Sequence, residues 1–207
     1  MEFVLPLLGI ALANLLAAMS PGPGVLLVAR IAIAGSRRAG LAAAAGMATG
    51  GMIWATAAIF GLALLFSELA WLYRAVQVVG GLYLVYIAAM IWRGARTPIE
   101  LQAGEVRGLT PERAYVTALL SYLANPKVVV FFGSVFIALL PAHAPGWVWA
   151  ATVAIITVNE AAWYTTLALS FSAAPMRRVY ARIKPGLDRA VAGVLTALGL
   201  KLVLDAR

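Results

Sequence analysis

The sequence contains no cysteine, a single histidine and few charged residues. Without cysteine the chain forms no disulfide, carries no thiol nucleophile and offers no thiolate metal ligand. The histidine, His143, lies in a short loop with no second histidine and no nearby carboxylate, so no metal site is expected there. We also find no phosphate-binding loop, no nucleotide-binding glycine motif and no histidine beside a nucleophile. These absences argue against ATP hydrolysis, soluble-enzyme chemistry and a bound cofactor.

Apolar residues, in contrast, make up 63% of the 207 residues, and only 12% are charged. The mean hydropathy is +0.93. This composition predicts an all-α integral membrane protein, because a helical crossing needs about 20 apolar residues. The first apolar run continues into the next without a small-residue cleavage site, so we interpret it as a retained span and not a signal peptide. Six apolar runs are present, at residues 3–35, 39–66, 69–92, 115–140, 147–171 and 187–204.

The formal charge of +8 comes mostly from short loops, since twelve of the sixteen lysines and arginines lie in the first, third and fifth loops. A basic patch on a soluble fold would suggest nucleic acid, but charges in membrane loops do not, and no nucleic-acid partner is expected. The positive-inside rule places these three loops in the cytoplasm and both termini outside. If the first run forms a hairpin, the assignment of the termini fails and that of the loops holds.

Two prolines and two glycines interrupt the first run within five residues. Proline removes a backbone donor and glycine holds a helix poorly, so a straight helix cannot continue through them. Lipid offers no partner to the freed backbone groups, so the break must face protein or a polar cavity. The break is therefore a candidate binding site, or a gate if it lies at the cytoplasmic surface. Its residues are Ser20, Pro21, Gly22, Pro23 and Gly24.

The second half of the chain repeats this pattern weakly. Residues 13–21 align with residues 118–126, and both segments end in a polar residue followed by proline. The third spans share a glycine motif, at 80–82 and 193–195. With three spans in each half, the second copy must be inverted, a plan that recurs in transporters with broken helices at the midplane. We expect one transmembrane transporter domain, 1–207, with repeats at about 1–92 and 114–207, a cytoplasmic loop at about 93–113, and spans one and four broken at proline motifs.

Both breaks are suited to starting a new helix inside the membrane. Pro23 and Pro126 fit the first helical turn, and Ser20 and Asn125 are possible caps. The N–H groups and positive dipole end of such a helix attract an anion, for example an α-carboxylate. Lys127 opposes the dipole in the first turn, so we expect a negative group close to it. The alternative is that Lys127 extends to the membrane surface.

Asn159 and Glu160 fall in the middle of the fifth run. An intramembrane carboxylate is costly unless it is paired, protonated or on a transport pathway. Glu160 is thus a candidate for binding an ammonium group, relaying a proton or pairing with Lys127, and a purely structural pair is the alternative. Tyr83 shares a helix face with a second tyrosine three residues on, and either lines the cavity or packs in the core. Glycines in spans two and three are expected to allow close helix packing.

At these motifs the sequence resembles the lysine exporter family, the LysE/RhtB-type amino-acid efflux proteins. Residues 20–24 are similar to the proline-glycine-proline signature of the family's first span, and residues 125–127 to the asparagine-proline-lysine signature of its fourth. The match continues through residues 81–86, Trp92-Arg93, Asp188-Arg189, Gly193 and Gly199-Leu200, and so covers nearly the whole chain.

The resemblance implies export of amino acids or their derivatives across the bacterial inner membrane, driven by an ion gradient such as that of protons. Many members carry an acid just after the span-two glycine, where this chain has Gly51, and an aspartate near the position of Asn159. Either the acid has moved to Glu160 or the substrate differs. The partners expected are a small-molecule amino-acid substrate, whose identity the sequence does not give, and the lipid bilayer, and a homodimer is possible for a chain of six spans. The rival functions are a membrane-embedded enzyme and a lipid-interacting or structural membrane protein.

Overall fold

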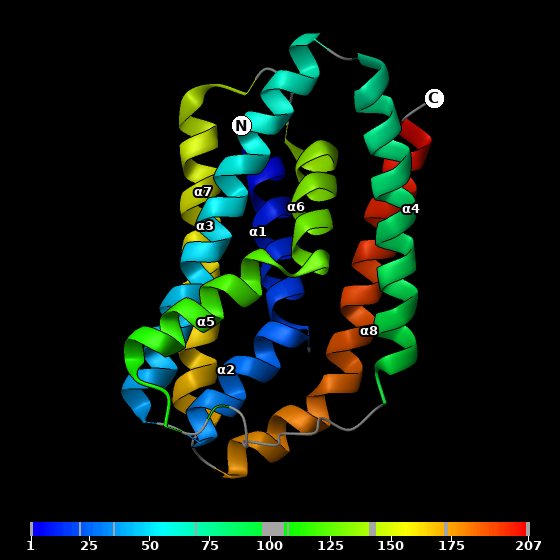
Figure 1. The fold of residues 1–207 in the computed structure, drawn as a ribbon. Helices are drawn as coiled ribbons and strands as arrows, with labels where there is room; N and C mark the ends of the chain where they lie inside the picture. Colours follow the sequence, from blue (N-terminus) through cyan, green and yellow to red (C-terminus); the bar gives the residue numbers. More distant parts are fainter. Residues whose placement is uncertain are drawn as a thin grey trace.

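The computed structural model of the chain is built of helices (Figure 1). It describes residues 2–20, 22–34, 36–68, 70–96, 106, 108–140, 144–171 and 174–205, so His143 and most of the third loop lie outside the described residues. The described residues form eight helices and no strand, which confirms the all-α prediction. The helices are α1 (Val4–Met19), α2 (Pro23–Ala34), α3 (Arg37–Glu68), α4 (Ala70–Gly94), α5 (Pro111–Leu123), α6 (Pro126–Leu139), α7 (Gly146–Phe171) and α8 (Ala174–Asp205).

Helices α3, α4, α7 and α8 each run from one end of the molecule to the other, and α1–α2 and α5–α6 do so as bent pairs (Figure 1). The bend between α1 and α2 is 56°, and that between α5 and α6 is 60°. By length and composition, Arg37–Gly61 of α3 and Gln77–Gly94 of α4 can cross a membrane, and up to four described spans are found if each bent pair counts as one. Six spans in two inverted repeats remain a prediction.

The outer surface carries large apolar side chains at helical spacing. Leu5, Leu8 and Leu12 are exposed on α1, and Leu82 and Tyr86 are exposed on α4. Residues three or four apart share one helix face, so each set forms an apolar stripe that points outward. Monomeric soluble proteins rarely expose such stripes, whereas a bilayer covers them. The surface therefore fits the membrane environment that the composition predicts.

The two ends of the molecule differ in charge. The ends of α2, α4 and α7 and the starts of α3, α5 and α8 lie at the lower end in Figure 1. Most of the described basic residues belong to these helix ends, to the residues directly beside them or to the first half of α8. They are Arg30, Arg37, Arg38, Arg93, Arg96, Arg113, Arg178, Arg182, Lys184 and Arg189.

Helices α4 and α8 pack closely where two glycines meet. A Cβ on Gly81 would lie 2.6 Å from the carbonyl oxygen of Gly199, and a Cβ on Gly199 would lie 2.5 Å from that of Gly81. Small residues let membrane helices pack backbone to backbone. Gly193, which the repeat pairs with the 80–81 glycines, is different, since a Cβ there would meet nothing within 4 Å. The packing role expected for Gly81 is confirmed.

We expect Gly81→Ala to destabilise the protein by about 1–3 kcal/mol, because the added methyl group has to push two backbones apart. Gly193→Ala is the matched control and should be neutral or stabilise the protein by up to about 1 kcal/mol, since its methyl group enters open space and alanine is the better helix former. Thermal unfolding in detergent measures both. Equal stability of the two variants would show that the α4–α8 contact adapts to an extra carbon.

Candidate functional site

The first helix break forms where a proline follows Ser20. The residue before a proline is disfavoured in the α conformation, and Ser20 is extended, with φ −65° and ψ 128°. Helix α1 therefore ends at Met19, and α2 begins at Pro23, which occupies the first helical position as predicted. Pro21 lies outside the described residues. The predicted cap at Ser20 is wrong, because the buried hydroxyl of Ser20 has no hydrogen-bond partner in the described structure.

The second break has the expected geometry. Asn125 is extended, with φ −78° and ψ 112°, and its side-chain Oδ1 accepts a hydrogen bond of 3.0 Å from the backbone N–H of Lys127. Asn125 is therefore the N-cap of α6, and Pro126 begins that helix. At this break one free N–H group of the new helix is already bonded to the cap. At the start of α2, the Ser20 hydroxyl supplies no such cap.

Lys127 bonds to the broken end of α1. Its Nζ donates a hydrogen bond of 3.2 Å to the carbonyl oxygen of Ala17, in the last turn of α1. Helix ends carry free carbonyl groups and partial negative charge, so a cation is stabilised there. The negative partner that the sequence predicts for Lys127 is thus, in this structure, the C-terminal end of α1. Among the described residues, Lys127 forms no ion pair with Glu160.

Glu160 is buried between three helices. Its Oε1 accepts a hydrogen bond of 3.0 Å from Asn14 Nδ2 on α1 and one of 2.7 Å from the Tyr122 hydroxyl on α5. Gly51 on α3 lies against the same side chain, since a Cβ at that position would be 2.9 Å from Glu160 Cγ. The absence of a side chain at Gly51 therefore leaves the space that Glu160 fills from α7. The Glu160 carboxylate thus bonds to both broken helix pairs, and the methylene groups of its side chain lie against α3.

A cavity of about 40 Å³ lies between the two breaks. A single water needs roughly 10–15 Å³, so this volume admits a few waters and no amino acid. Three buried polar atoms of its lining residues, Glu160 Oε2, Asn14 Oδ1 and Ser20 Oγ, have no hydrogen-bond partner in the described structure. Two of them accept only, and they suit a ligand that donates hydrogen bonds. The other lining residues are Ala17, Ala18, Gly22, Gly24, Val25, Tyr122, Asn125, Lys127, Val128, Phe131, Phe132 and Tyr164.

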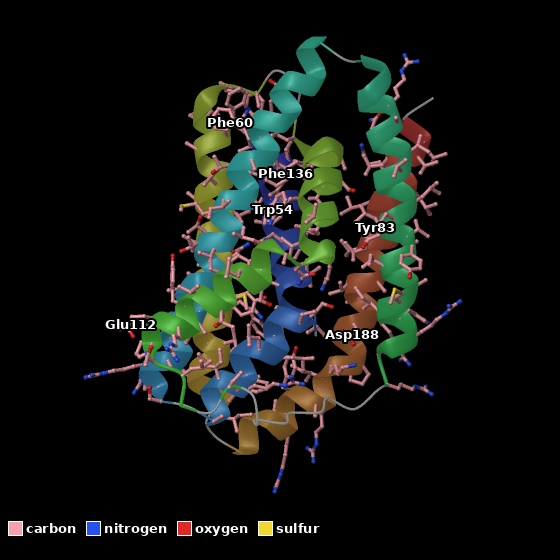
Figure 2. The ribbon with its side chains drawn as sticks, viewed as in Figure 1. Trp54, Phe60, Tyr83, Glu112, Phe136 and Asp188 are labelled. Atoms are coloured by element: carbon pink, nitrogen blue, oxygen red, sulfur yellow. The ribbon has the colours of Figure 1, made fainter. Side chains whose placement is uncertain are left out.

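The structure brings most of the predicted site residues to this cavity. Ser20, Gly22, Gly24, Asn125, Lys127 and Glu160 all line it, and Pro23 and Pro126 begin the two helices beside it. Tyr83 and Asn159 do not line it. Asn159 instead donates a hydrogen bond of 2.9 Å to the carbonyl oxygen of Ala11 and fastens α7 to α1. Tyr83 is half-buried on α4, with its ring 5.9 Å from that of Tyr86, on the α4–α8 side of the molecule (Figure 2).

Sequence reasoning did not assign a role to Asn14, Tyr122 or Tyr164. Asn14 is a polar residue inside an apolar run, which is the same signal that drew attention to Glu160. Tyr122 comes three residues before the cap Asn125. A tyrosine in an apolar run is not unusual, and the position of Tyr122 in the sequence does not identify Glu160 as its hydrogen-bond partner. Tyr164 is four residues after Glu160, so it lies on the same face of α7. A Cβ on Gly24 would be only 2.8 Å from its hydroxyl, so α2 and α7 meet there.

Comparison with known proteins yields one family across almost the full length. The model of the LysE type translocator family matches residues 15–206. The "Threonine efflux protein" of Escherichia coli (strain K12) is 32% identical over 200 residues, which cover 96% of this chain and 97% of the relative. The "Leucine efflux protein" of Salmonella choleraesuis (strain SC-B67) is 31% identical over 126 residues, covering 60% of this chain and 58% of the relative. No solved structure matches the chain significantly.

Proposed function

The chain belongs to the LysE type translocator family, and we propose that it exports a small amino acid through the cavity between its two helix breaks. Members of this family are multi-pass inner-membrane transporters and not enzymes. Amino-acid efflux is therefore the general activity. The proposal adds the site, the coupling to protons and the orientation of the loops.

One observation supports the site above all others: an acid and a cation line the same cavity. A free amino acid carries an ammonium group and a carboxylate, so it needs both kinds of partner. The ammonium group has three N–H donors and fits the unpaired Glu160 Oε2 and Asn14 Oδ1. Lys127 uses one bond for Ala17 and keeps donors for the carboxylate.

The carboxylate is further supported by the start of α2. Gly22, Gly24 and Val25 line the cavity at the positive end of that helix dipole. At α6 the Asn125 side chain already accepts from the Lys127 N–H. We therefore place the substrate carboxylate between Lys127 and the first turn of α2, which narrows the initial hypothesis that both helix starts share it. Val25, Val128 and Phe131 then surround the substrate side chain and favour a small or aliphatic one.

Proton coupling follows if one carboxylate holds either a proton or the ammonium group, but never both. On one side of the membrane the substrate displaces the proton from Glu160, and on the other side a proton displaces the substrate. Substrate and proton are then carried across the membrane in opposite directions. The cavity is smaller than an amino acid, so a second conformation has to enlarge it, and rocking of the two halves is the general way in which repeat-built transporters do this. The basic end of the molecule faces the cytoplasm in this scheme.

The experiment is an efflux assay with purified protein in liposomes loaded with single labelled amino acids, with and without a pH gradient. We expect a few small or aliphatic amino acids, threonine and leucine among the first to test, to leave faster when the outside is acidic. Liposomes without protein give the baseline. Baseline efflux of every amino acid, with folded protein present, would favour the lipid-interacting or structural alternative.

A further inference from the structure

Helix α8 consists of two parts that run in different directions and pack against different helices. Its upper part packs along α4, whereas its first turns lie across the lower end of the molecule and the helix then turns upward (Figure 1). Pro185 lies inside the helix between these parts. Proline has no N–H to bond the preceding turn and its ring weakens the helix there. The next residue, Gly186, has open space where a Cβ would be. Residues 174–184, the arm of α8, thus join the rest at a weak point.

The arm reaches the helix break of the proposed site. The Tyr180 hydroxyl donates a hydrogen bond of 3.0 Å to the carbonyl oxygen of Met19, the last residue of α1. The Tyr180 ring is buried and packs against two aromatic rings of α7, at 5.2 Å from Phe171 and 6.3 Å from Trp163. Since Ser20 follows Met19 and lines the cavity, the arm holds the chain at the edge of the cavity.

A buried lysine ties the end of the arm to α4. Lys184 Nζ donates to the carbonyl oxygens of Gly94 and Ala95, at 2.9 and 3.1 Å, and to Asp188 Oδ2 at 2.9 Å. These carbonyls belong to the end of α4, where a cation is stabilised by the helix dipole. Both Lys184 and Asp188 are buried (Figure 2 labels Asp188). A buried cation with three acceptors is a strong, discrete contact that is either made or broken.

We propose that Tyr180 and Lys184 are the positioning residues of a cytoplasmic gate. They close the cavity on the side that faces the basic end of the molecule, by fastening the α8 arm to α1 and α4. Opening breaks the Tyr180–Met19 and Lys184–α4 bonds, and the arm swings at Pro185–Gly186 while the upper part of α8 stays on α4. The inference extends the proposed transport function, because it supplies the conformational change that lets the substrate enter from the cytoplasm.

The test uses the absence of cysteine from the chain, since Ser20→Cys then supplies the only thiol. The Ser20 hydroxyl has no hydrogen bond to lose, so the substitution should not disturb the break. Ser20 is only 2% exposed, so a maleimide can label the new cysteine only when the gate is open. A membrane-impermeant maleimide is added to inside-out vesicles, and the labelling rate is measured with no substrate. Adding Tyr180→Phe should speed labelling roughly two- to tenfold, the factor given by loss of one hydrogen bond. Tyr86→Phe, on the exposed face of α4, should leave the rate unchanged.

A second variant acts on the hinge. Pro185→Ala restores the helical N–H and stiffens the arm, so labelling of Ser20→Cys should become slower than in the parent, although the closed-state contacts are untouched. An unchanged rate in both the Tyr180→Phe and Pro185→Ala variants would overturn the gate, and so would faster labelling from the opposite face of the membrane only. Because no amino acid is present, these results do not depend on the identity of the substrate. A failed efflux assay with normal gating would reject the transport site and retain the gate.

Discussion

Glu160→Gln is expected to abolish efflux that is driven by a pH gradient. Glutamine has the same size and keeps an oxygen that can accept from Asn14 and Tyr122, so the fold should be preserved. It has no negative charge and cannot exchange a proton. Loss of a hydrogen bond to a charged group is worth about 1.5–3 kcal/mol, and hence roughly a tenfold to hundredfold drop in binding of the ammonium group.

The assay measures two fluxes in the same liposomes. One is net efflux driven by a pH gradient, and the other is exchange of labelled for unlabelled amino acid without a gradient. If Glu160 holds the proton and the ammonium group in turn, net efflux is lost and exchange needs roughly tenfold to hundredfold more substrate. If it only relays the proton, exchange is normal. Asp205→Asn is the control, because this acid is half-exposed and pairs with Lys201 far along α8. Unchanged gradient-driven efflux in Glu160→Gln would remove this residue from the mechanism.

Lys127→Met is expected to raise the KM for amino acids by roughly tenfold or more, since the substrate carboxylate loses a charged hydrogen-bond donor. The Ala17 carbonyl oxygen loses its Lys127 bond as well, so a stability loss of about 1–3 kcal/mol should accompany the change. Lys201→Met is the control. It removes a half-exposed lysine from α8 and should change neither the KM nor the stability by much.

A carboxylate-free probe separates the two roles of Lys127. An amino-acid amide retains the ammonium group and side chain, and its ability to inhibit efflux should be nearly the same in the parent and in Lys127→Met. The amino acid itself should become a much weaker competitor in the variant. If stability falls while the KM is unchanged, Lys127 serves only to tie α6 to α1.

The breaks and the charged residues were predictable because each violates a rule that holds along a membrane helix. Pro23 and Pro126 cannot continue a helix, so their positions fix where α2 and α6 begin. Charged side chains such as Glu160 and Lys127 are costly in an apolar run, so the sequence alone marks them as unusual, whatever the arrangement of the helices. The partner of Lys127 was not predictable, because it is the backbone carbonyl of Ala17, 110 residues away, and no side chain in the sequence marks it.

The contacts among helices were the part that sequence could not give. The Asn14 and Tyr122 bonds to Glu160 depend on how α1, α5 and α7 are rotated about their axes, and apolar runs without clear polar faces do not specify this. Tyr83 shows the same limit, since its spacing to Tyr86 correctly predicts a shared face but not which way that face points. The position of Ser20 before a proline predicts a cap, but two residues separate Ser20 from the start of α2, and its hydroxyl has no hydrogen-bond partner in the described structure.

The central claim is that the amino acid binds between the two helix breaks, and photo-cross-linking tests it most directly. The probe is a diazirine-bearing aliphatic amino acid that inhibits efflux, and the cross-linked residues are identified by peptide mass spectrometry. We predict adducts on the cavity residues Val25, Val128 and Phe131, which disappear when an excess of transported amino acid is added. Adducts that are competed away by substrate but lie elsewhere in the fold, with none at the cavity, would contradict the account.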